Sequence, residues 1–310
     1  MRAQIKHITT YHYPQPASDS FNELRLQPVQ TSTQSLLGFQ LYIDPDTAAT
    51  SHTDYFGMTV HSFHVRKPHS TLRVETHAVV VTHAAALPQP ILARSLEPHR
   101  NSFYDYLEPT ERVPRGNWTA TLELPDLQDD EDLLEYLRAL NTCIRTGFTY
   151  APGATGVGTT LAEFVAGRTG VCQDYAHLML AVCREQRIPA RYISGYIYAG
   201  REFVGAGATH AWVECFIPHD EGGVWFGFDP TNGVLQTEYH IVIGWGRDYN
   251  DVAPMKGSRR GGGAETLEVT VSVQVQQCCA RQLEWRPRLR LLFQQRSFCI
   301  LNFYATHYQQ

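Results

Sequence analysis

The stretch from Gly170 to Leu178, Gly-Val-Cys-Gln-Asp-Tyr-Ala-His-Leu, has the pattern of a buried helix that starts at a cysteine. Thr169 is a favourable N-cap residue, which would place Cys172 in the first helical turn. The apolar residues that follow repeat at the spacing of one helix face: Tyr175, Leu178, Met179 and Val182. Free N–H groups and aligned peptide dipoles at a helix N-terminus favour a thiolate and can hold an oxyanion. The stretch therefore predicts a cysteine nucleophile or, as for most lone cysteines, a packing residue.

A nucleophilic cysteine needs a base, and a strand predicted further along the chain supplies a candidate. His177 does not qualify, because five residues along a helix turn it by about 500° away from Cys172. Residues 209–216, Thr-His-Ala-Trp-Val-Glu-Cys-Phe, alternate and are rich in β-forming side chains, which predicts a strand that carries His210. Taken alone, His210 is equally well explained as a strand histidine at a sheet edge.

A carboxylate follows the next predicted strand. Residues 224–228, Val-Trp-Phe-Gly-Phe, are apolar and end at Asp229, ahead of a Pro-Thr-Asn-Gly turn. The loop between the two strands contains proline and glycine and predicts a hairpin, which would bring His210 and Asp229 side by side. A Cys-His-Asp relay results if the cysteine helix packs against this hairpin. The rival interpretation makes Asp229 a turn residue, with Glu214 or Asp174 orienting the histidine.

Four ordered segments resemble the transglutaminase-like core. They are Gly-Val-Cys-Gln-Asp at 170–174, Arg-Ile-Pro-Ala-Arg-Tyr-Ile-Ser-Gly-Tyr at 187–196, Thr-His-Ala-Trp-Val-Glu at 209–214 and Phe-Asp-Pro-Thr-Asn at 228–232. In that family the cysteine, the histidine of His-Ala-Trp and the aspartate of Asp-Pro-Thr form the catalytic triad. The resemblance carries these roles onto Cys172, His210 and Asp229. It also implies a papain-like core of helices packed on an antiparallel sheet.

The resemblance implies cysteine-dependent acyl transfer on protein or peptide amides, in which glutamine is joined to a primary amine through an acyl-enzyme. The alternatives are a cysteine protease or amide hydrolase with the same triad, and a non-catalytic peptide-binding module. Candidates for the oxyanion hole or the substrate cleft are Gln173, Tyr150 and Trp212, although a packing role is commoner for a tyrosine such as Tyr150. No cofactor is expected, because no nucleotide or flavin motif appears. No metal is expected either, because the histidines between His52 and His83 lack ligand spacing.

The fold class predicted for the whole chain is α+β. Residues 1–84 form short alternating segments separated by turn residues, which predicts an all-β domain built as a small sandwich or barrel. This part resembles the N-terminal domain that precedes many bacterial transglutaminase-like cores, with residues 22–28 and 54–57 as the supporting segments. A proline-rich connector over residues 85–128 and a catalytic core over residues 129–276 are expected to follow.

Local patterns predict three further elements of the core. Residues 129–146 have an acidic start and apolar residues at helical spacing, which predicts an amphipathic helix. Thr160 and Glu163 form a capping box at the start of a short helix. Residues 267–273 alternate as a last strand. Residues 277–310 contain five arginines and one acid, and are expected to be either a poorly ordered non-native or readthrough extension or an added docking helix.

Composition limits the class of partner and the compartment. The net charge of −5 with mixed signs implies no basic surface for nucleic acid. The N-terminus lacks an apolar signal segment, and the most apolar run, residues 78–87, is too short to cross a bilayer, so no membrane association is expected. Seven cysteines without a Cys-x-x-Cys motif suggest reduced thiols in a cytoplasmic protein. The expected partners are a protein or peptide substrate and, for a transferase, a primary amine.

Overall fold

A single long strand, β1 (Arg2–Leu24), is the common partner of four other strands. The computed structural model describes residues 1–198, 200, 203–219 and 222–276, so the predicted C-terminal extension lies outside the described residues. The N-terminal half of β1 pairs antiparallel with β5 (His69–Thr82) on one side and with β14 (Thr266–Val275) on the other. Its C-terminal half pairs in the same way with β4 (Thr59–Val65) and β13 (Met255–Gly261).

The outer strands complete this sheet. β2 (Gln34–Asp44) pairs with β5, and β3 (Ala49–Thr53) pairs with β4. The predicted last strand is therefore present as β14, but it pairs with the N-terminal strand of the chain. Strand alternation predicted the element and could not predict its partner, because period-2 patterning identifies a buried face and carries no information about the neighbouring strand.

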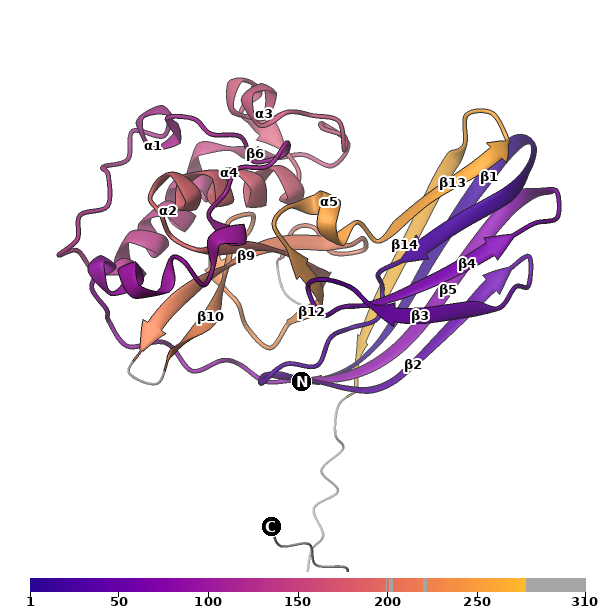
Figure 1. The fold of residues 1–310 in the computed structure, drawn as a ribbon, viewed down its shortest axis with the longest axis horizontal. Helices are drawn as coiled ribbons and strands as arrows, with labels where there is room; N and C mark the ends of the chain where they lie inside the picture. The colour runs from indigo at the N-terminus through magenta and orange to yellow at the C-terminus, as the bar shows by residue number, and fades with distance from the viewer. Residues whose placement is uncertain (199, 201–202, 220–221, 277–310) are drawn as a thin grey trace, which may run out of the picture. The chain divides into compact units, whose positions relative to one another are not determined.

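The sheet bends back on itself to form two layers. Tyr11 and Met255 line the same small cavity, although an extended β1 would separate Tyr11 from Leu24, the partner of Met255, by about 40 Å. In Figure 1 the strands of this sheet run to the right of the view, where turns connect them and the chain reverses direction. Apolar residues from both layers share one core, among them Val74 of β5 and Phe63 of β4. The architecture is a small β-sandwich, one of the two predicted forms.

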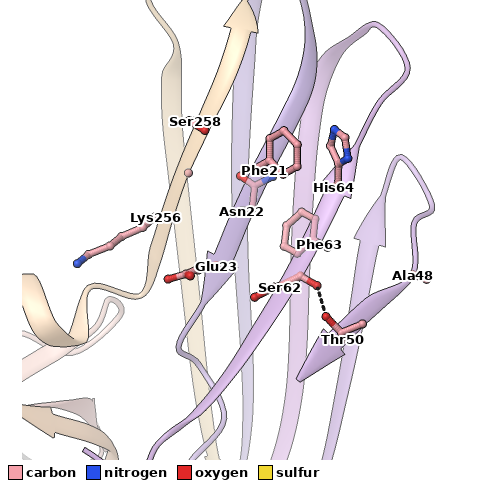
Figure 2. Close-up of a pocket in the computed structure, with 11 residues that line it drawn as sticks. Phe21, Asn22, Glu23, Ala48, Thr50, Ser62, Phe63, His64, Lys256 and Ser258 are labelled. Carbon is pink, nitrogen blue, oxygen red and sulfur yellow. Dashed lines mark hydrogen bonds between the residues drawn. The ribbon is translucent and has the colours of Figure 1, made fainter. Parts of the chain in front are cut away.

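A shallow pocket of about 630 Å³ lies on the outer face of the layer that contains β4 and β13 (Figure 2). Phe21 of β1 stacks on His64 of β4 with their ring centroids 3.8 Å apart, and Glu23 and Lys256 line the same pocket. None of its lining residues belongs to the elements that carry Cys172.

A second antiparallel sheet carries the predicted hairpin. Its strand order is β11-β10-β9-β8-β12, with bounds Val234–Leu235, Gly222–Asp229, His210–His219, Ala190–Ile197 and His240–Gly246. β9 and β10 pair directly, with Val213 opposite Phe228. Both predicted strands are confirmed, and every residue of β9 except His219 is buried. Helices cover the face that carries Val213, and Trp212 on the other face packs in a second apolar cluster.

Three helices accompany this second sheet: α2 (Leu133–Gly147), α3 (Leu161–Gly167) and α4 (Cys172–Glu185). Of these, α2 and α4 pack on the sheet (Figure 1). The capping box of Thr160 and Glu163 is present, and the carboxylate of Asp132 caps α2. The short elements are η1 (Ala93–His99), η2 (Tyr104–Tyr106), α1 (Trp118–Thr121), β6 (Thr149–Tyr150), β7 (Thr169–Gly170) and α5 (Tyr249–Val252). The result is an α+β fold, as predicted.

Side-chain hydrogen bonds join the sandwich to the core sheet. Gln34 is buried, and its amide nitrogen donates to the Val29 and Val242 carbonyls at 2.7 Å each. Its amide oxygen accepts from the Val242 N–H at 2.8 Å. Gln34 therefore satisfies backbone groups of β12, the edge strand of the core sheet, in place of a further strand.

Candidate active site

Cys172 is the first residue of α4, and its side chain is partly buried. The N-cap of α4 is Val171, so the predicted Thr169 cap is wrong: Thr169 lies in β7, where pairing with Thr149 holds it extended. Asp174 supplies the capping interaction, because its carboxylate accepts from the Val171 N–H at 2.8 Å. The expected helix N-terminus is nevertheless at the cysteine, with its free N–H groups available there.

His210 and Asp229 are in direct contact, as the hairpin predicted. Nε2 of His210 is 2.8 Å from Oδ2 of Asp229, and both side chains are completely buried. His210 is the first residue of β9 and Asp229 is the last residue of β10, so the antiparallel pairing of the two strands brings them together.

Further donors fix the Asp229 carboxylate. Oδ1 accepts from the backbone N–H groups of Thr231 and Asn232, at 3.0 and 3.2 Å. Oδ2 accepts from the Asn232 side-chain amide at 2.7 Å. All three donors belong to the Pro-Thr-Asn turn that follows the strand, so the turn holds the carboxylate in place.

Burial and charge act on this pair in opposite directions. Burial lowers the pKa of His210, but the charge and hydrogen bond of Asp229, followed by Cys172, raise that pKa to about 10. Burial raises the pKa of Asp229, and the charge and hydrogen bond of His210 hold it well below its usual range. At neutral pH the pair is therefore an imidazolium and a carboxylate.

The second ring nitrogen of His210 is directed away from Asp229. Within the described residues, Nδ1 of His210 makes no hydrogen bond of ordinary geometry, and Cys172 is close enough to affect the pKa of the ring. Burial and then Cys172 raise the pKa of Tyr150 to about 12, so this hydroxyl lies in the same environment and stays protonated. A Cβ atom on Gly205 would lie 2.6 Å from Nδ1 and 3.6 Å from the Tyr150 oxygen. The space beside Nδ1 of His210 is thus bordered by Cys172, Tyr150 and Gly205.

The other two predicted cleft residues differ in placement. Gln173 is the second residue of α4 and is partly buried, next to Cys172. Trp212 is completely buried, its indole N–H donates to Gln236 at 3.2 Å, and its ring lies 6.1 Å from that of His210. Trp212 therefore packs near the histidine ring, and its only hydrogen-bond donor already has a partner, so it is not free to bind an oxyanion.

The rival orienting residues have other partners. Glu214 accepts two hydrogen bonds from Arg191, at 2.8 and 2.6 Å, and the Arg191 guanidinium lies between the rings of Trp225 and Trp245. Asp174 accepts from the Thr155 hydroxyl at 2.6 Å as well as from Val171. The structure brings neither carboxylate to His210.

Two further buried histidines, His177 and His240, belong to the same part of the fold. Nε2 of His177 accepts from the Tyr249 N–H at 3.3 Å, and burial lowers the pKa of this ring to about 3. His240, which the sequence analysis did not select, places Nε2 at 3.3 Å from Oδ2 of Asp229. The only signal for His240 was a histidine at the start of a strand, which no motif distinguished from the other histidines of the chain.

No group of three or more His, Cys, Asp or Glu side chains in residues 1–198, 200, 203–219 and 222–276 is arranged to hold a metal ion. Over the same part of the chain, no helix has the length and apolar character needed to cross a membrane.

Comparisons with known proteins agree with this architecture. The bacterial transglutaminase-like N-terminal region matches residues 3–81, and the transglutaminase-like superfamily matches residues 124–230. The uncharacterized protein ML0607 of Mycobacterium leprae is 35% identical over 282 residues, which cover 88% of this chain and 98% of the relative. The uncharacterized protein Rv2569c of Mycobacterium tuberculosis is 33% identical and covers 83% of this chain and 87% of its own.

A solved structure shares the fold. A proposed cysteine protease from Cytophaga hutchinsonii superposes with a TM-score of 0.69 at 22% identity, over 89% of this chain and 91% of that chain. Fold and site thus define an α+β protein of the transglutaminase-like class. The chain belongs to the transglutaminase-like superfamily and carries the bacterial transglutaminase-like N-terminal region. This membership supports a cysteine enzyme.

Proposed function

We propose that this protein is a cysteine acyltransferase that joins glutamine side chains of a protein or peptide to a primary amine. The observation that carries the proposal is the buried hydrogen bond between His210 and Asp229, which leaves Nδ1 of His210 without a partner among the described residues. Cys172, at the start of α4, is close enough to raise the pKa of this ring. The same three residue types in this arrangement activate thiol nucleophiles on unrelated folds.

In the first half-reaction, the Cys172 thiolate attacks the amide carbonyl and forms a tetrahedral oxyanion. The Cys172 N–H at the helix N-terminus donates to this oxyanion, and the protonated Tyr150 hydroxyl is the best placed of the candidate second donors. His210 then gives its Nδ1 proton to the leaving amine as the carbon–nitrogen bond breaks, which yields a thioester and ammonia. Asp229 keeps the other ring proton on Nε2 throughout.

In the second half-reaction, a primary amine attacks the thioester. His210 accepts the proton of the attacking amine, and the carbon–sulfur bond breaks to restore the thiolate. Attack by water at the same step gives a hydrolase, and a main-chain amide as substrate gives a protease. The amine is proposed as the acceptor because membership of the transglutaminase-like superfamily supports it; burial of the His210 ring bears equally on amine and water.

The intact site argues against a binding module without activity, since peptide binding alone does not require the buried ion pair of His210 and Asp229. Protein or peptide substrates remain the proposed partners, and the net charge gives no reason to propose nucleic acid. A cytoplasmic location is proposed because reduced thiols suit the four described cysteines, all of which are free.

Mass spectrometry of a glutamine-containing peptide library, with and without a primary amine, tests the proposal. Amine adducts that depend on Cys172 support a transferase, and the Cys172→Ala variant is the control for each product. Deamidation or chain cleavage in place of adducts identifies a hydrolase or protease. A library that the wild-type protein leaves unchanged contradicts the catalytic assignment.

A further inference from the structure

His240 contacts Asp229, the aspartate of the proposed triad, and lies after the family motifs in the sequence. Its Nε2 is 3.3 Å from Oδ2 of Asp229, the oxygen that also accepts from Nε2 of His210. The His240 side chain is completely buried, like those of His210 and Asp229. One carboxylate oxygen is therefore shared by two imidazoles.

The local backbone fixes which nitrogen of His240 carries the proton. Nδ1 of His240 lies 3.2 Å from the backbone N–H of Thr237 and 3.3 Å from its hydroxyl. A backbone N–H can only donate, so Nδ1 is the acceptor and Nε2 carries the proton. His240 thus donates a hydrogen bond to Asp229.

Aromatic neighbours hold the ring in this orientation. The Trp212 ring meets that of His240 edge-on, with centroids 5.2 Å apart, and the Phe203 ring lies 6.0 Å away. His240 is also the first residue of β12, so its main chain is paired with Ile197 of β8. Both the backbone and the ring of His240 are therefore constrained.

We propose that His240 is a positioning residue that holds Asp229 in the rotamer in which Oδ2 accepts from His210. Through Asp229, His240 keeps Nδ1 of His210 directed toward Cys172. The proposal rests on the proposed function for its kinetic consequences. The same hydrogen bond stabilises the charged form of Asp229. Burial raises the pKa of this carboxyl, His210 lowers it, and the His240 hydrogen bond lowers it further.

Two amide substitutions separate the hydrogen bond from the packing. The nitrogen of a glutamine side chain reaches the place of Nε2, so His240→Gln keeps a donor to Asp229. An asparagine side chain ends near the place of Nδ1, so His240→Asn keeps a partner for Thr237 and loses the donor. We expect kcat of His240→Asn to fall by about 10- to 100-fold, the size expected for one hydrogen bond to a charged group, with KM nearly unchanged. His240→Gln should stay within about threefold of wild type.

Equal losses in the two variants would assign His240 a packing role and overturn the proposal, and so would wild-type rates in both. If His240→Asn does not fold, His240→Phe replaces it, because phenylalanine keeps an aromatic ring and has no donor.

A substrate-free measurement separates this inference from the proposed function. The hydrogen-bonded Nε2 proton of His210 is followed by NMR in the full chain, and its assignment is checked by its loss in His210→Gln. We expect this resonance to be retained in His240→Gln and shifted or broadened in His240→Asn. If the wild-type protein has no turnover, the proposed function fails while this signal still decides the role of His240. An unchanged resonance in His240→Asn would overturn it.

Discussion

Five donors surround the carboxylate of Asp229: the backbone N–H groups of Thr231 and Asn232, the Asn232 amide, and the imidazoles of His210 and His240. The side chain is completely buried, and so are its partners Thr231, His210 and His240, whereas the bonds from Asn232 are partly buried. A carboxylate in this position both orients the histidine and ties the end of β10 to the turn that follows it.

Replacing Asp229 with asparagine should therefore affect rate and stability together. An asparagine amide places an N–H group against donors that need an acceptor, and it can favour the wrong tautomer of His210. We expect kcat to fall by about 10²- to 10⁴-fold, measured on a glutamine peptide, with a lower melting temperature. Glu214→Gln and Asp174→Asn are the matched controls, because these carboxylates bond Arg191 and Thr155 instead. A larger rate loss in Glu214→Gln would mean that Asp229 is not the orienting residue; a loss in Asp174→Asn is read together with the capping of the Cys172 helix.

The charged pair also makes stability depend on pH. The pKa of His210 rises from 6.5 to about 10 on folding, so its contribution is complete below pH 6.5 and is lost as the pH rises toward 10. The pKa of Asp229 is lowered, so its contribution is present above its unfolded value of about 3.9 and is lost in acid.

Between pH 6.5 and 10, the free energy of unfolding of the wild type should fall more steeply than that of His210→Gln, which lacks the titrating ring. Urea denaturation of both proteins across this range measures the difference. Parallel curves would show that His210 does not take up a proton on folding.

At the scale of elements, residues 203–209, ahead of β9, lie against the histidine. The Val204 N–H donates to the Asn232 side chain at 2.9 Å, and the Asn232 amide donates back to the Val204 carbonyl at 3.4 Å. Asn232 also bonds Asp229, so one side chain connects this loop to the triad. Gly205 follows, with a φ of +86° and its Cα hydrogens against Nδ1 of His210.

Gly205→Ala should therefore lower activity much more than Gly207→Ala. Both glycines have positive φ, +86° and +94°, so both substitutions carry a backbone strain of about 1–2 kcal/mol. A Cβ at Gly205 would lie 2.6 Å from Nδ1 of His210, whereas one at Gly207 has nothing within 4 Å. We expect at least a tenfold lower kcat for Gly205→Ala alone, together with a lower melting temperature than that of Gly207→Ala, because only the Gly205 Cβ clashes with a buried ring. Equal activities would show that the loop moves away from His210 before the reaction.

Elements with a local signal were predictable from the sequence, and contacts between distant segments were not. Cys172, His210 and Asp229 stood in motifs whose strands and helix could be identified from periodicity, and the hairpin followed from the residues between them. The Thr169 cap was wrong because strand pairing with Thr149 overrode a local capping preference. His240 had no local signal, because its contact with Asp229 joins the start of β12 to the end of β10, two strands that β8 and β9 separate in the sheet.

At the scale of the whole molecule, the N-terminal sandwich supports the strand that carries His240. Gln34 bonds both backbone groups of Val242, two residues along β12 from His240. His7 of β1 is 2.9 Å from the Tyr196 hydroxyl, and the Thr82 hydroxyl donates to the Glu238 carbonyl at 2.6 Å. Contacts of this kind make the sandwich part of the environment of the site.

Gln34→Ala should destabilise the protein by about 2 to 4 kcal/mol, because it removes three hydrogen bonds of a buried side chain, each worth about 1 kcal/mol. Gln40→Ala is the control: Gln40 is an exposed residue of the same strand, and its loss should cost less than about 0.5 kcal/mol. Chemical denaturation of both variants measures the two values. Similar losses would mean that Gln34 does not secure the edge of β12.

The pairing of β1 also sets an order of events during synthesis. Ala3 pairs with Val275, so the first strand to leave the ribosome must wait for the last strand of the described chain. Until then one side of β1 has unpaired backbone groups, while the residues of the site have already been made. We expect ribosome-bound chains that end before β13 to have a protease-sensitive N-terminal region and chains that extend past β14 to be protected; equal protection would contradict this. The N-terminal sandwich would then be completed after the core that it precedes in the sequence.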